Sequence, residues 1–356
     1  MDSSEQTAMK FLQPQGDLQR LRVAAVVVSY NRRDLLQETL QALLAQTVRP
    51  DAVIVVDNGS TDDAAAVAAH NLEQLGAAGQ LIKLQHNTGG AGGFAVGIAA
   101  AINTELEGFA PDWVWVMDDD TVPHPTALET ALHAHREYAA TGPDSLAVIG
   151  SRVVWTNGQE HPMNTPKQKI GVTSSEVARS EAVGATAIRS ISFVSALLRT
   201  SRIQEVGLPV AAYFLWNDDF EYSARLLHGA HGIYVPHSVV THKTKALGSS
   251  DHDPGERFRY EVRNKIWLFK HSRALKPWER AAYRAATARR WVRTFKRSSA
   301  PVVLARACEQ GLKEAYRAAP LPNSMVLQGA GVPQDVATVI AALDPATASK
   351  HGRWRR

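Results

Sequence analysis

The chain has 356 residues, of which 45% are hydrophobic and 21% are charged, a balance typical of a globular protein with one large domain and an appendage. No apolar run reaches the roughly 18 to 20 residues of a membrane-spanning helix, and the polar first twenty residues lack the apolar segment of a secretory signal. The single cysteine, Cys308, excludes an internal disulfide and a cysteine-based zinc site, and it suits a reducing cytoplasm.

The formal net charge is only +4, but its distribution along the chain is uneven. Fifteen Lys or Arg residues and only two acids, Glu261 and Glu279, lie between Arg257 and Arg306. Such an excess of one sign predicts an anionic partner, which could be phospholipid headgroups, nucleic acid or a phosphorylated substrate.

Residues 1–20 are polar, and we predict that they are poorly ordered. Apolar runs and helical spacing of Leu and Ala then alternate along the chain. The predicted elements in order are a strand at 21–29, a helix at 34–46, a strand at 52–56, a helix at 63–77, a strand at 81–84, a helix at 92–106 and a strand at 113–117. This alternation predicts a doubly wound α/β sheet with parallel strands, which binds ligands beyond the carboxyl ends of its strands.

The second half of the chain is less regular. We expect strands at 147–155, 187–198 and 232–235, and a helix at 219–227. From 257 to 318 the pattern indicates basic, amphipathic helices, and proline and glycine residues from 319 to 356 predict a tail.

Three consecutive aspartates, Asp118, Asp119 and Asp120, follow the strand predicted at 113–117. Carboxylates this close repel one another and raise one another's pKa. A divalent cation that also binds a phosphate would relieve this repulsion, because Mg²⁺ and Mn²⁺ favour carboxylate and phosphate oxygens. A solvated acidic turn is the simpler interpretation of the triplet alone, and the motifs below favour the metal site.

Asp57 ends the strand predicted at 52–56 and starts the turn Asp-Asn-Gly-Ser-Thr-Asp. An aspartate at this place in a parallel sheet can accept hydrogen bonds from a ribose or a base. It can equally form an Asx turn before the next helix, and this segment leaves both interpretations open.

The segment His86-Asn-Thr-Gly-Gly-Ala-Gly-Gly93 is rich in glycine and opens the helix predicted at 92–106. Glycines let a backbone approach a ligand closely, and a helix N-terminus can face a phosphate. The segment does not follow the first strand and lacks the spacing of a dinucleotide fingerprint, so a dehydrogenase is disfavoured.

Asp218 and Asp219 open the helix predicted at 219–227, and His242 follows a β-branched run near the end of the irregular region. A carboxylate at a helix N-terminus can act as a general base on a hydroxyl, or it can simply cap the helix. A neutral imidazole at His242 could complete a metal site with the aspartates, with His237 as the competing histidine.

Taken in order, these segments resemble a family 2 glycosyltransferase with the GT-A fold, over about residues 21–270. The sequences NTGGAGGF and WNDDFEYSAR most resemble bacterial galactofuranosyltransferases of cell-wall galactan synthesis, with rhamnosyltransferases close behind. The resemblance implies a Rossmann-like, mostly parallel sheet over 21–256, followed by the basic helical region at 257–318 and the tail.

The resemblance also implies a role for each matching residue. Those assigned to the nucleotide-sugar donor are Ser29, Arg32, Asp57, Asn87, Gly89, Gly90 and Asp119. Those assigned to a Mn²⁺ or Mg²⁺ ion are Asp118, Asp120 and His242. On the acceptor side, Asp219 would be the catalytic base, Asp218 would orient the acceptor or the sugar, and Trp216 would form a platform.

The implied reaction is an inverting transfer of a sugar, galactofuranose from UDP-galactofuranose, to a hydroxyl of a lipid-linked cell-wall glycan. Many relatives have Glu-Asp where this chain has Asp218-Asp219, which leaves the choice of base between them open. The galactan polymerases are longer and carry an additional N-terminal domain, so we expect a single-addition enzyme. The alternatives are a dTDP-rhamnose-dependent rhamnosyltransferase, a nucleotidyltransferase, and a sugar-nucleotide binder without activity.

Basic and aromatic residues share the helices predicted at 257–318, a composition that suits an anionic membrane surface. We therefore expect a cytoplasmic enzyme associated peripherally with the inner face of the cell membrane, where a polyprenyl-diphosphate-linked acceptor would lie. The alternative is a helical face that packs by its apolar side and is otherwise solvated. No nucleic-acid module accompanies the charge, so nucleic acid is not expected as a partner.

Overall fold

The computed structural model describes residues 20–74, 78–245, 247 and 253–344, so the N-terminal segment predicted to be poorly ordered lies almost wholly outside the described residues. Its strands are β1 (Val23–Ser29), β2 (Ala52–Asp57), β3 (Ala78–Lys83), β4 (Trp113–Asp118), β5 (Thr121–Pro123), β6 (Leu146–Val154), β7 (Lys167–Gln168), β8 (Thr186–Ser190), β9 (Ala196–Arg199) and β10 (His231–His242). They form one ten-stranded sheet in the order β3-β2-β1-β4-β9-β6-β10-β8-β7, and β5 pairs with β10 off this path.

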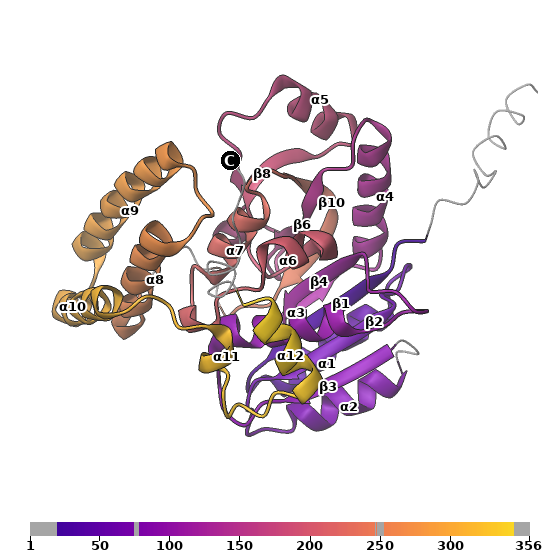
Figure 1. Cartoon of the computed structure of the whole chain (residues 1–356), viewed down its shortest axis with the longest axis horizontal. Helices are drawn as coiled ribbons and strands as arrows, with labels where there is room; N and C mark the ends of the chain where they lie inside the picture. Colours follow the sequence, from indigo (N-terminus) through magenta and orange to yellow (C-terminus); the bar gives the residue numbers. More distant parts are fainter. Residues whose placement is uncertain (1–19, 75–77, 246, 248–252, 345–356) are drawn as a thin grey trace, which may run out of the picture.

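Helices cover both faces of this sheet (Figure 1). The helices are α1 (Arg33–Leu44), α2 (Ala64–Gln74), α3 (Gly89–Asn103), α4 (Ala127–Ala140), α5 (Ser174–Ala182), α6 (Thr200–Val206), α7 (Asp218–Leu226), α8 (Phe258–His271), α9 (Pro277–Arg297), α10 (Pro301–Arg317), α11 (Asn323–Val326) and α12 (Gln334–Ala342). Short 3₁₀ turns lie at η2 (Pro162–Asn164), η3 (Ala211–Tyr213) and η4 (Gly255–Arg257).

Strands β3, β2, β1 and β4 are parallel, as the alternation of strands and helices predicted. Both faces of β1 are buried: Val26 and its alternate neighbours pack with α3, and Val27 and its neighbours pack with α1 and α4. This double burial explains why the strand is apolar throughout rather than alternating. The parallel strands all end at one edge of the sheet, where the predicted site residues follow them.

The predicted strand at 187–198 is wrong as a single element, because it divides into β8 and β9. Strand β8 pairs with β10, whereas β9 lies antiparallel between β4 and β6. One uninterrupted strand could not occupy both places in the sheet, so the chain leaves the sheet at 191–195. Strand β10, predicted at 232–235, is much longer and reaches His242.

The segment at 319–356, for which we expected a tail, contains α11 and α12 within its described part. Val336 and Ile340 lie four residues apart on α12 and are buried in the same core as α3. An i, i+4 apolar pair places both side chains on one face of a helix, which explains why this short helix packs against the domain.

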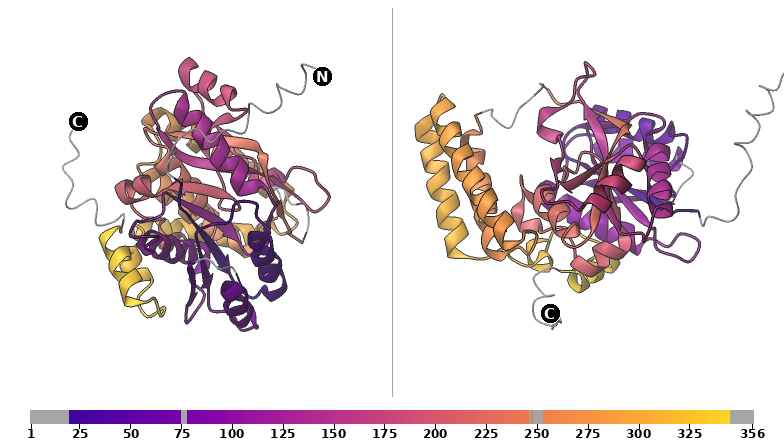
Figure 2. Two further views of the ribbon diagram at one scale, coloured as in Figure 1. Left: turned by 90° about the vertical axis from the view of Figure 1, so that its right-hand side faces the viewer. Right: turned by 90° about the horizontal axis from the view of Figure 1, so that it is seen from above.

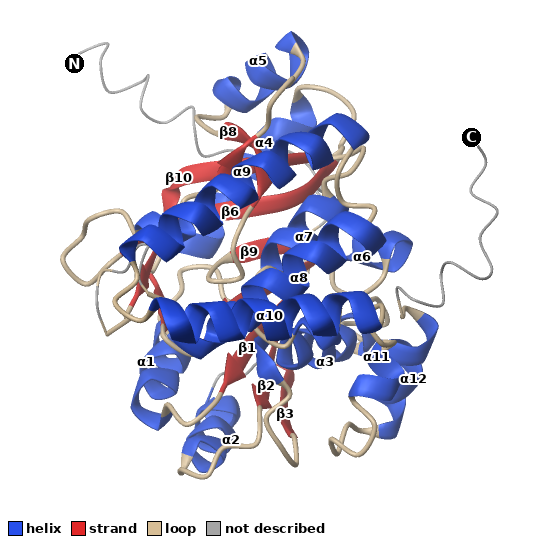
Figure 3. Ribbon diagram, turned by 90° about the vertical axis from the view of Figure 1, so that its left-hand side faces the viewer, coloured by secondary structure: helices blue, strands red, loops and turns tan. Residues whose placement is uncertain are grey.

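Helices α8, α9 and α10 form a layer beside the sheet (Figure 2), and Figure 3 shows α8 between α7 and α10. Leu268 and Phe269 of α8 pack with Ala224 of α7, and Val262 on another face packs with Leu304 of α10. The basic helical region is therefore joined through α8 to the part of the chain that forms the sheet.

A buried ion pair attaches the start of α9 to the sheet. Arg189 of β8 donates to both carboxylate oxygens of Glu279, at 2.7 and 3.0 Å, and also donates to the carbonyl oxygens of Ala224 and Ala274. Both side chains are almost fully buried. Removing one partner would leave the other charge buried without compensation.

We predict that Glu279→Ala lowers the free energy of unfolding by roughly 3–5 kcal/mol, because it leaves the Arg189 guanidinium buried and unpaired. Urea denaturation followed by circular dichroism measures this change. The control is Glu160→Ala, which removes the partner of Arg152 from a solvent-exposed pair at 3.3 Å and should have a far smaller effect. Equal losses in the two variants would contradict the prediction.

Candidate active site

Asp118, Asp120 and His242 meet at the carboxyl end of β4. The chain turns directly after Asp118 into β5, and Thr121 of β5 pairs with His242 of β10 in an antiparallel register. This pairing brings a histidine from more than a hundred residues away next to the aspartates. One ligand atom from each of the three residues lies within 4.8 Å of the other two.

The hydrogen-bond partner of His242 leaves one of its ring nitrogens available to a metal ion. Its Nδ1 atom lies 3.0 Å from the side-chain oxygen of Asn164, an acceptor, so Nδ1 carries the hydrogen. The Nε2 atom faces Asp120 Oδ1 at 3.1 Å, and the two are not aligned for a hydrogen bond. With Nδ1 directed at Asn164, the Nε2 atom lies beside two carboxylates, and an imidazole nitrogen with carboxylate oxygens is a donor set for Mn²⁺ or Mg²⁺.

The aspartates are crowded, and their pKa values show how the protein holds them. Burial and the charges of its two neighbours raise the pKa of Asp118 well above its usual range. Burial also raises the pKa of Asp119 to about 6, although Arg32 opposes the shift. For Asp120 burial acts in the same direction, but His242 and Arg32 outweigh it and the pKa falls below its usual value.

Arg32 lies among these carboxylates. Its guanidinium bonds to Asp120 and lies 3.3 Å from Asp119 Oδ1. The backbone N–H of Tyr30 also donates to Asp119, at 3.1 Å. Thus Asp119 and Arg32, both assigned to the donor from the sequence, bond to each other and connect the end of β1 to the aspartate turn.

The other residues assigned to the donor follow β1, β2 and β3. Ser29 pairs with Asp57 across the parallel strands, and both side chains are buried. Asp57 Oδ1 accepts at 3.0 Å from the N–H of Ser60, three residues further on, whereas an Asx turn bonds to the N–H two residues on. This contact therefore leaves both interpretations of Asp57 open. Asn87 Oδ1 accepts from the N–H of Gly89 at 2.8 Å.

Asn58 is a buried residue that the sequence did not single out. Its side-chain oxygen accepts from the N–H and hydroxyl of Thr88, both at 2.9 Å, and its side-chain nitrogen donates to the carbonyl of Gly89 at 2.9 Å. Asn58 therefore joins the turn after β2 to the start of α3. Its place directly after the predicted Asp57 was the only signal in the sequence.

The glycines at the start of α3 differ in what they face. Gly89 has φ of +76°, and a Cβ atom there would lie 2.1 Å from the carbonyl oxygen of Phe214. Gly93 approaches Val28 of β1 closely, so this glycine serves helix-to-sheet packing. Gly90 faces open space, which leaves it free for the approach of a ligand.

Asp218 and Asp219 are the first residues of α7, as predicted to within one residue. Asp218 is buried, and burial together with repulsion from Asp219 raises its pKa to about 8. Its charge in turn contributes to the raised pKa of Asp118, so the acid pair and the aspartate triplet share one electrostatic cluster. Asp219 is half-buried and accepts from the N–H of Phe220 at 2.6 Å.

Lys265 of α8 is a functional candidate that the sequence analysis missed. It is 6% exposed, and its Nζ atom lies 4.4 Å from the centre of the Phe220 ring. Burial lowers the pKa of Lys265 to about 8 despite the nearby Glu261. For Asp219, burial raises the pKa, and the Phe220 N–H and Lys265 oppose that shift. Nothing in the sequence distinguished Lys265 from the other basic residues of its helix.

The segment before α7 is strained. Three of four consecutive non-glycine residues, Phe214, Trp216 and Asn217, have φ between +62° and +66°. Phe214 is the centre of a γ-turn, with φ +62° and ψ −61° and a 2.7 Å hydrogen bond from Leu215 N to Tyr213 O. Such residues cost roughly 1–3 kcal/mol each and persist where the surroundings hold them. Trp216, assigned to the acceptor, lies half-buried in this segment.

The structure thus gathers two carboxylates and an imidazole that can hold a divalent cation, a second acid pair with raised pKa values, and basic side chains that balance them. Turns with buried polar side chains, which follow the parallel strands, lie at the same edge of the sheet as the aspartates. The roles that we assigned to the individual residues stay predictions.

Comparison with known proteins indicates a family. A family model described as glycosyltransferase like family 2 matches residues 20–263. The galactofuranosyltransferase GlfT1 of Mycolicibacterium smegmatis is 29% identical over 214 residues, which cover 58% of this chain and 65% of that protein. GlfT1 of Mycobacterium tuberculosis is 33% identical over 215 residues, covering 58% and 64%. The match therefore spans somewhat less than two thirds of the length of these relatives.

Solved structures agree on the fold. The crystal structure of S. aureus TarS 1–349 in complex with UDP has a TM-score of 0.57 and 14% identity, covering 94% of this chain and 93% of that chain. The same protein in complex with UDP-GlcNAc has a TM-score of 0.56 and 15% identity, with the same coverage. At this identity the likeness concerns the fold alone, and it agrees with the predicted GT-A architecture.

We predict that Asp218→Asn stabilises the protein increasingly as pH rises. Asp218 keeps its proton in the folded state up to a pKa of about 8, whereas in the unfolded chain it ionises near 3.9. At this group the folded state therefore binds more protons between these values, so Asp218 lowers wild-type stability as pH rises, and the asparagine variant lacks this contribution.

The melting temperatures of both proteins with a chelator present, at pH 5 and at pH 8.5, measure this effect. The increase in melting temperature of Asp218→Asn over the wild type should be small at pH 5 and larger at pH 8.5. The matched control is Glu73→Gln, which changes an exposed acid on α2. A difference between wild type and Asp218→Asn that is the same at both pH values would contradict the assigned pKa.

Proposed function

We propose that this chain, which belongs to glycosyltransferase family 2 and is a glycosyltransferase, transfers galactofuranose from UDP-galactofuranose to a hydroxyl of a lipid-linked cell-wall glycan. The observation that carries the proposal is the joining of Asp118, Asp120 and His242 beside the acid pair of α7. A binder without activity would have little use for ionisable acids with raised pKa values beside a cation site.

The sugar and the nucleotide rest on the relatives. Two matched relatives are named galactofuranosyltransferases, which supports galactofuranose as the sugar. TarS, which shares the fold, has been crystallised with UDP and with UDP-GlcNAc, which is compatible with a uridine diphosphate donor. The donor would lie along the ends of β1, β2 and β3. The residues proposed to contact it are Ser29, Arg32, Asp57, Asn87, Gly89, Gly90 and Asp119.

Asp118, Asp120 and His242 would hold a Mn²⁺ or Mg²⁺ ion, which supplies positive charge against the departing nucleoside diphosphate. Asp219 takes the proton from the acceptor hydroxyl, which attacks the anomeric carbon from the face opposite the leaving group. Because one base acts and no covalent intermediate forms, the anomeric configuration inverts. Lys265 favours the ionised form of Asp219 that this step requires.

Asp218 has a different part in this mechanism. With a pKa of about 8 it is protonated near neutral pH and can donate a hydrogen bond, which suits a group that orients the acceptor or the sugar. Trp216, two residues earlier, would offer its ring as a platform for the acceptor. This division of roles favours Asp219 over Asp218 as the base.

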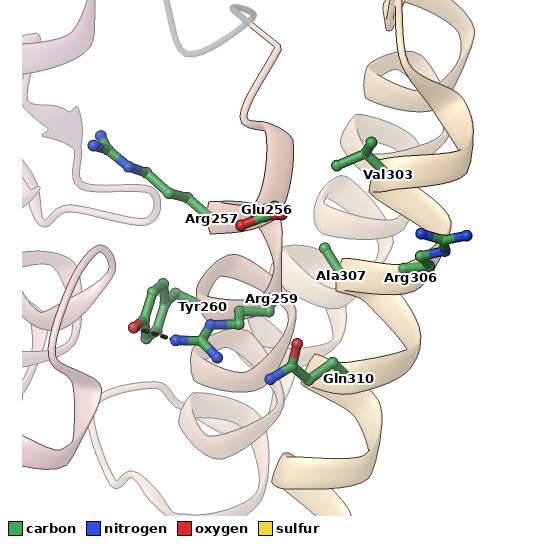
Figure 4. Close-up of a pocket in the computed structure, with 8 residues that line it drawn as sticks. All are labelled: Glu256, Arg257, Arg259, Tyr260, Val303, Arg306, Ala307 and Gln310. Atoms are coloured by element: carbon green, nitrogen blue, oxygen red, sulfur yellow. Dashed lines mark hydrogen bonds between the residues drawn. The ribbon is translucent and has the colours of Figure 1, made fainter.

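A pocket of about 470 Å³ between η4, α8 and α10 supports an anionic acceptor. Its charged lining consists of Arg257, Arg259 and Arg306 and a single acid, Glu256. Figure 4 shows Arg257 extending towards the catalytic body, and Arg259 bonds to the hydroxyl of Tyr260 at 2.6 Å. Within the described part of the chain, Arg257 and Arg306 have no ion-pair partner. A lipid-linked diphosphate carries negative charge, which would complement the excess of positive charge in this pocket.

The outer surface of α9 supports a membrane partner. The helix carries seven Lys or Arg residues and one acid, and it exposes Trp278 and Val292 among them. No helix in the described ranges has the length and apolar character needed to cross a bilayer. The proposed arrangement is a catalytic domain over 21–256 and a helical region at 257–318 that lies on the anionic inner face of the cell membrane.

A donor panel tests the function. Thermal shifts of UDP-galactofuranose, UDP-galactopyranose and dTDP-rhamnose are measured with Mn²⁺, with Mg²⁺ and with a chelator. The proposal expects a shift with UDP sugars that requires the metal and that Asp120→Asn abolishes. A thermal shift with dTDP-rhamnose alone would indicate rhamnose rather than galactofuranose as the transferred sugar. The absence of a shift with every donor would contradict the proposed function.

We predict that Asp219→Asn lowers kcat by at least about 10³-fold, since the acceptor hydroxyl loses its base, while donor affinity changes little. Asp218→Asn keeps a hydrogen-bond donor in place of the protonated acid, so it should keep considerably more activity. Product formation from radiolabelled donor measures both variants. If Asp218→Asn were the more damaged of the two, the roles of the two residues would be exchanged.

We predict that the protein floats with vesicles that contain phosphatidylglycerol and not with phosphatidylcholine vesicles, and that salt weakens this binding. Arg289→Glu with Arg293→Glu on the exposed part of α9 should abolish flotation. The matched control is Arg49→Glu with Arg136→Glu, two exposed arginines outside the basic region. Flotation that does not depend on lipid charge would refute the proposal that α9 binds an anionic membrane. An equal loss of flotation in the two double variants would also refute it.

A further inference from the structure

Helix α8 binds the strained segment before α7 through side chains rather than through backbone pairing. Asn264 is 0% exposed, and its side-chain nitrogen lies 3.0, 2.9 and 2.9 Å from the carbonyl oxygens of Tyr213, Leu215 and Trp216. An amide nitrogen has two hydrogens, so three acceptors at these distances share them. A single side chain thus bonds to three of the four carbonyl oxygens of residues 213–216.

Neighbouring residues of α8 extend this contact in both directions. Arg263 donates to the carbonyl oxygens of Ala212 and Tyr213, both at 2.9 Å. At the other end of the segment, the side chain of Asn217 donates to Glu261 at 2.7 Å. Residues 212–217 are therefore held almost continuously by one face of α8. A backbone with three left-handed non-glycine residues requires such external support.

The same segment contacts both halves of the proposed site. The carbonyl oxygen of Phe214 accepts from the N–H of Ala91 at 3.3 Å and lies where a side chain on Gly89 would otherwise be. The Phe214 ring stacks on Tyr260 of α8, with 5.4 Å between ring centres. The segment then ends at Asn217, whose carbonyl receives the first helical hydrogen bond of α7, from Glu221. A shift of residues 213–217 would therefore move the acids at the start of α7, which follow this segment directly.

We propose that Asn264 is a positioning residue of the active site, which holds residues 213–217 in their left-handed path and thereby aims Asp218 and Asp219. The catalytic roles of Asp218 and Asp219 in this inference rest on the proposed function. The claim that residues 213–217 depend on Asn264 for their conformation is independent of that function. The basic helical region would then complete the active site as well as offering a surface to the acceptor.

The chain offers a matched control in Asn323 of α11. This asparagine is equally buried, at 1% exposed, and holds the backbone just before the strained segment. Its nitrogen donates to the carbonyl of Pro209 at 2.8 Å, and its oxygen accepts from the N–H of Ala211 at 2.8 Å. Substitution at either position removes a buried amide donor to backbone carbonyls, but only Asn264 bonds to residues with positive φ and their neighbours.

The experiment compares Asn264→Asp and Asn264→Ala with Asn323→Asp and Asn323→Ala in the full chain. The aspartate cannot donate to the carbonyls, and the alanine removes the donor without adding a charge, so one variant remains interpretable if the other folds poorly. The variants are compared at a temperature where each is fully folded. The first readout is the division of any loss between kcat and donor affinity, and the second is hydrogen exchange of peptides that cover residues 213–220, beyond the backbone that Asn323 holds.

For the Asn264 variants we expect kcat to fall between about tenfold and a hundredfold, because a misaimed base disrupts the alignment of the reacting atoms. UDP affinity measured by calorimetry should change much less, and exchange in peptides from 213–220 should become faster. The Asn323 variants should have a lower melting temperature than the wild type and should keep most of its kcat. A merely structural role for Asn264 would give both asparagines the same pattern, and that result would overturn the proposal.

The two readouts also separate this inference from the proposed function. If the wild-type protein turned over no sugar nucleotide, the proposed function would fail, and the exchange data would still decide whether Asn264 holds the segment. Faster exchange in the Asn264 variants alone would support the positioning role, and unchanged exchange would overturn it whatever the activity. Wild-type turnover with unaltered kcat in the Asn264 variants would likewise overturn it while leaving the proposed function intact.

Discussion

The crowding of carboxylates at the carboxyl end of β4 is the constraint on which the rest of the site depends. Asp118, Asp119 and Asp120 are consecutive, and the charge of Asp218 adds to them from α7. Like charges in a partly buried cluster resist ionisation, so the protein surrounds them with cations or keeps some of them protonated. Arg32 and His242 lower the pKa of Asp120, whereas Asp118 and Asp218 keep raised values. Asp118 and Asp120, together with His242, are therefore candidate ligands for a divalent cation.

Helix α8, which is remote in sequence from the aspartates, also contributes residues to this candidate site. Asp219 is balanced by Lys265 of α8, and the strained segment before α7 is held by Asn264 of the same helix. Both interactions cost stability in isolation, one by burying an amine and the other by holding positive φ values. They persist because α8 is fixed by packing against α7 on one side and α10 on the other. The basic helices are therefore structurally continuous with the catalytic body, although their composition differs from it.

Much of the fold could be predicted from local pattern. The apolar strands of the first half were located to within a few residues, because strands buried on both faces leave continuous apolar runs. The error at 187–198 has the opposite cause. That run has the composition of one strand, and only the pairing of β8 with β10 and of β9 with β4 and β6 divides it. Likewise, the helices within the predicted tail are short and depend on α3 for their burial.

The sequence by itself determined the class of sheet and the residues at the carboxyl end of each parallel strand, because these depend on the order of elements along the chain. That ligands bind at this edge stays a prediction. The sequence also indicated Asp118, Asp120 and His242 as candidate partners. Only the tertiary structure decided that Arg32 lies on the aspartates and that Lys265 acts on Asp219. It also decided that Asn264 bonds to the backbone before α7 and that Phe214 requires a glycine at position 89. These contacts join segments far apart in sequence, and a buried lysine or asparagine on a helix has the same local pattern whether it meets an active site or ordinary core.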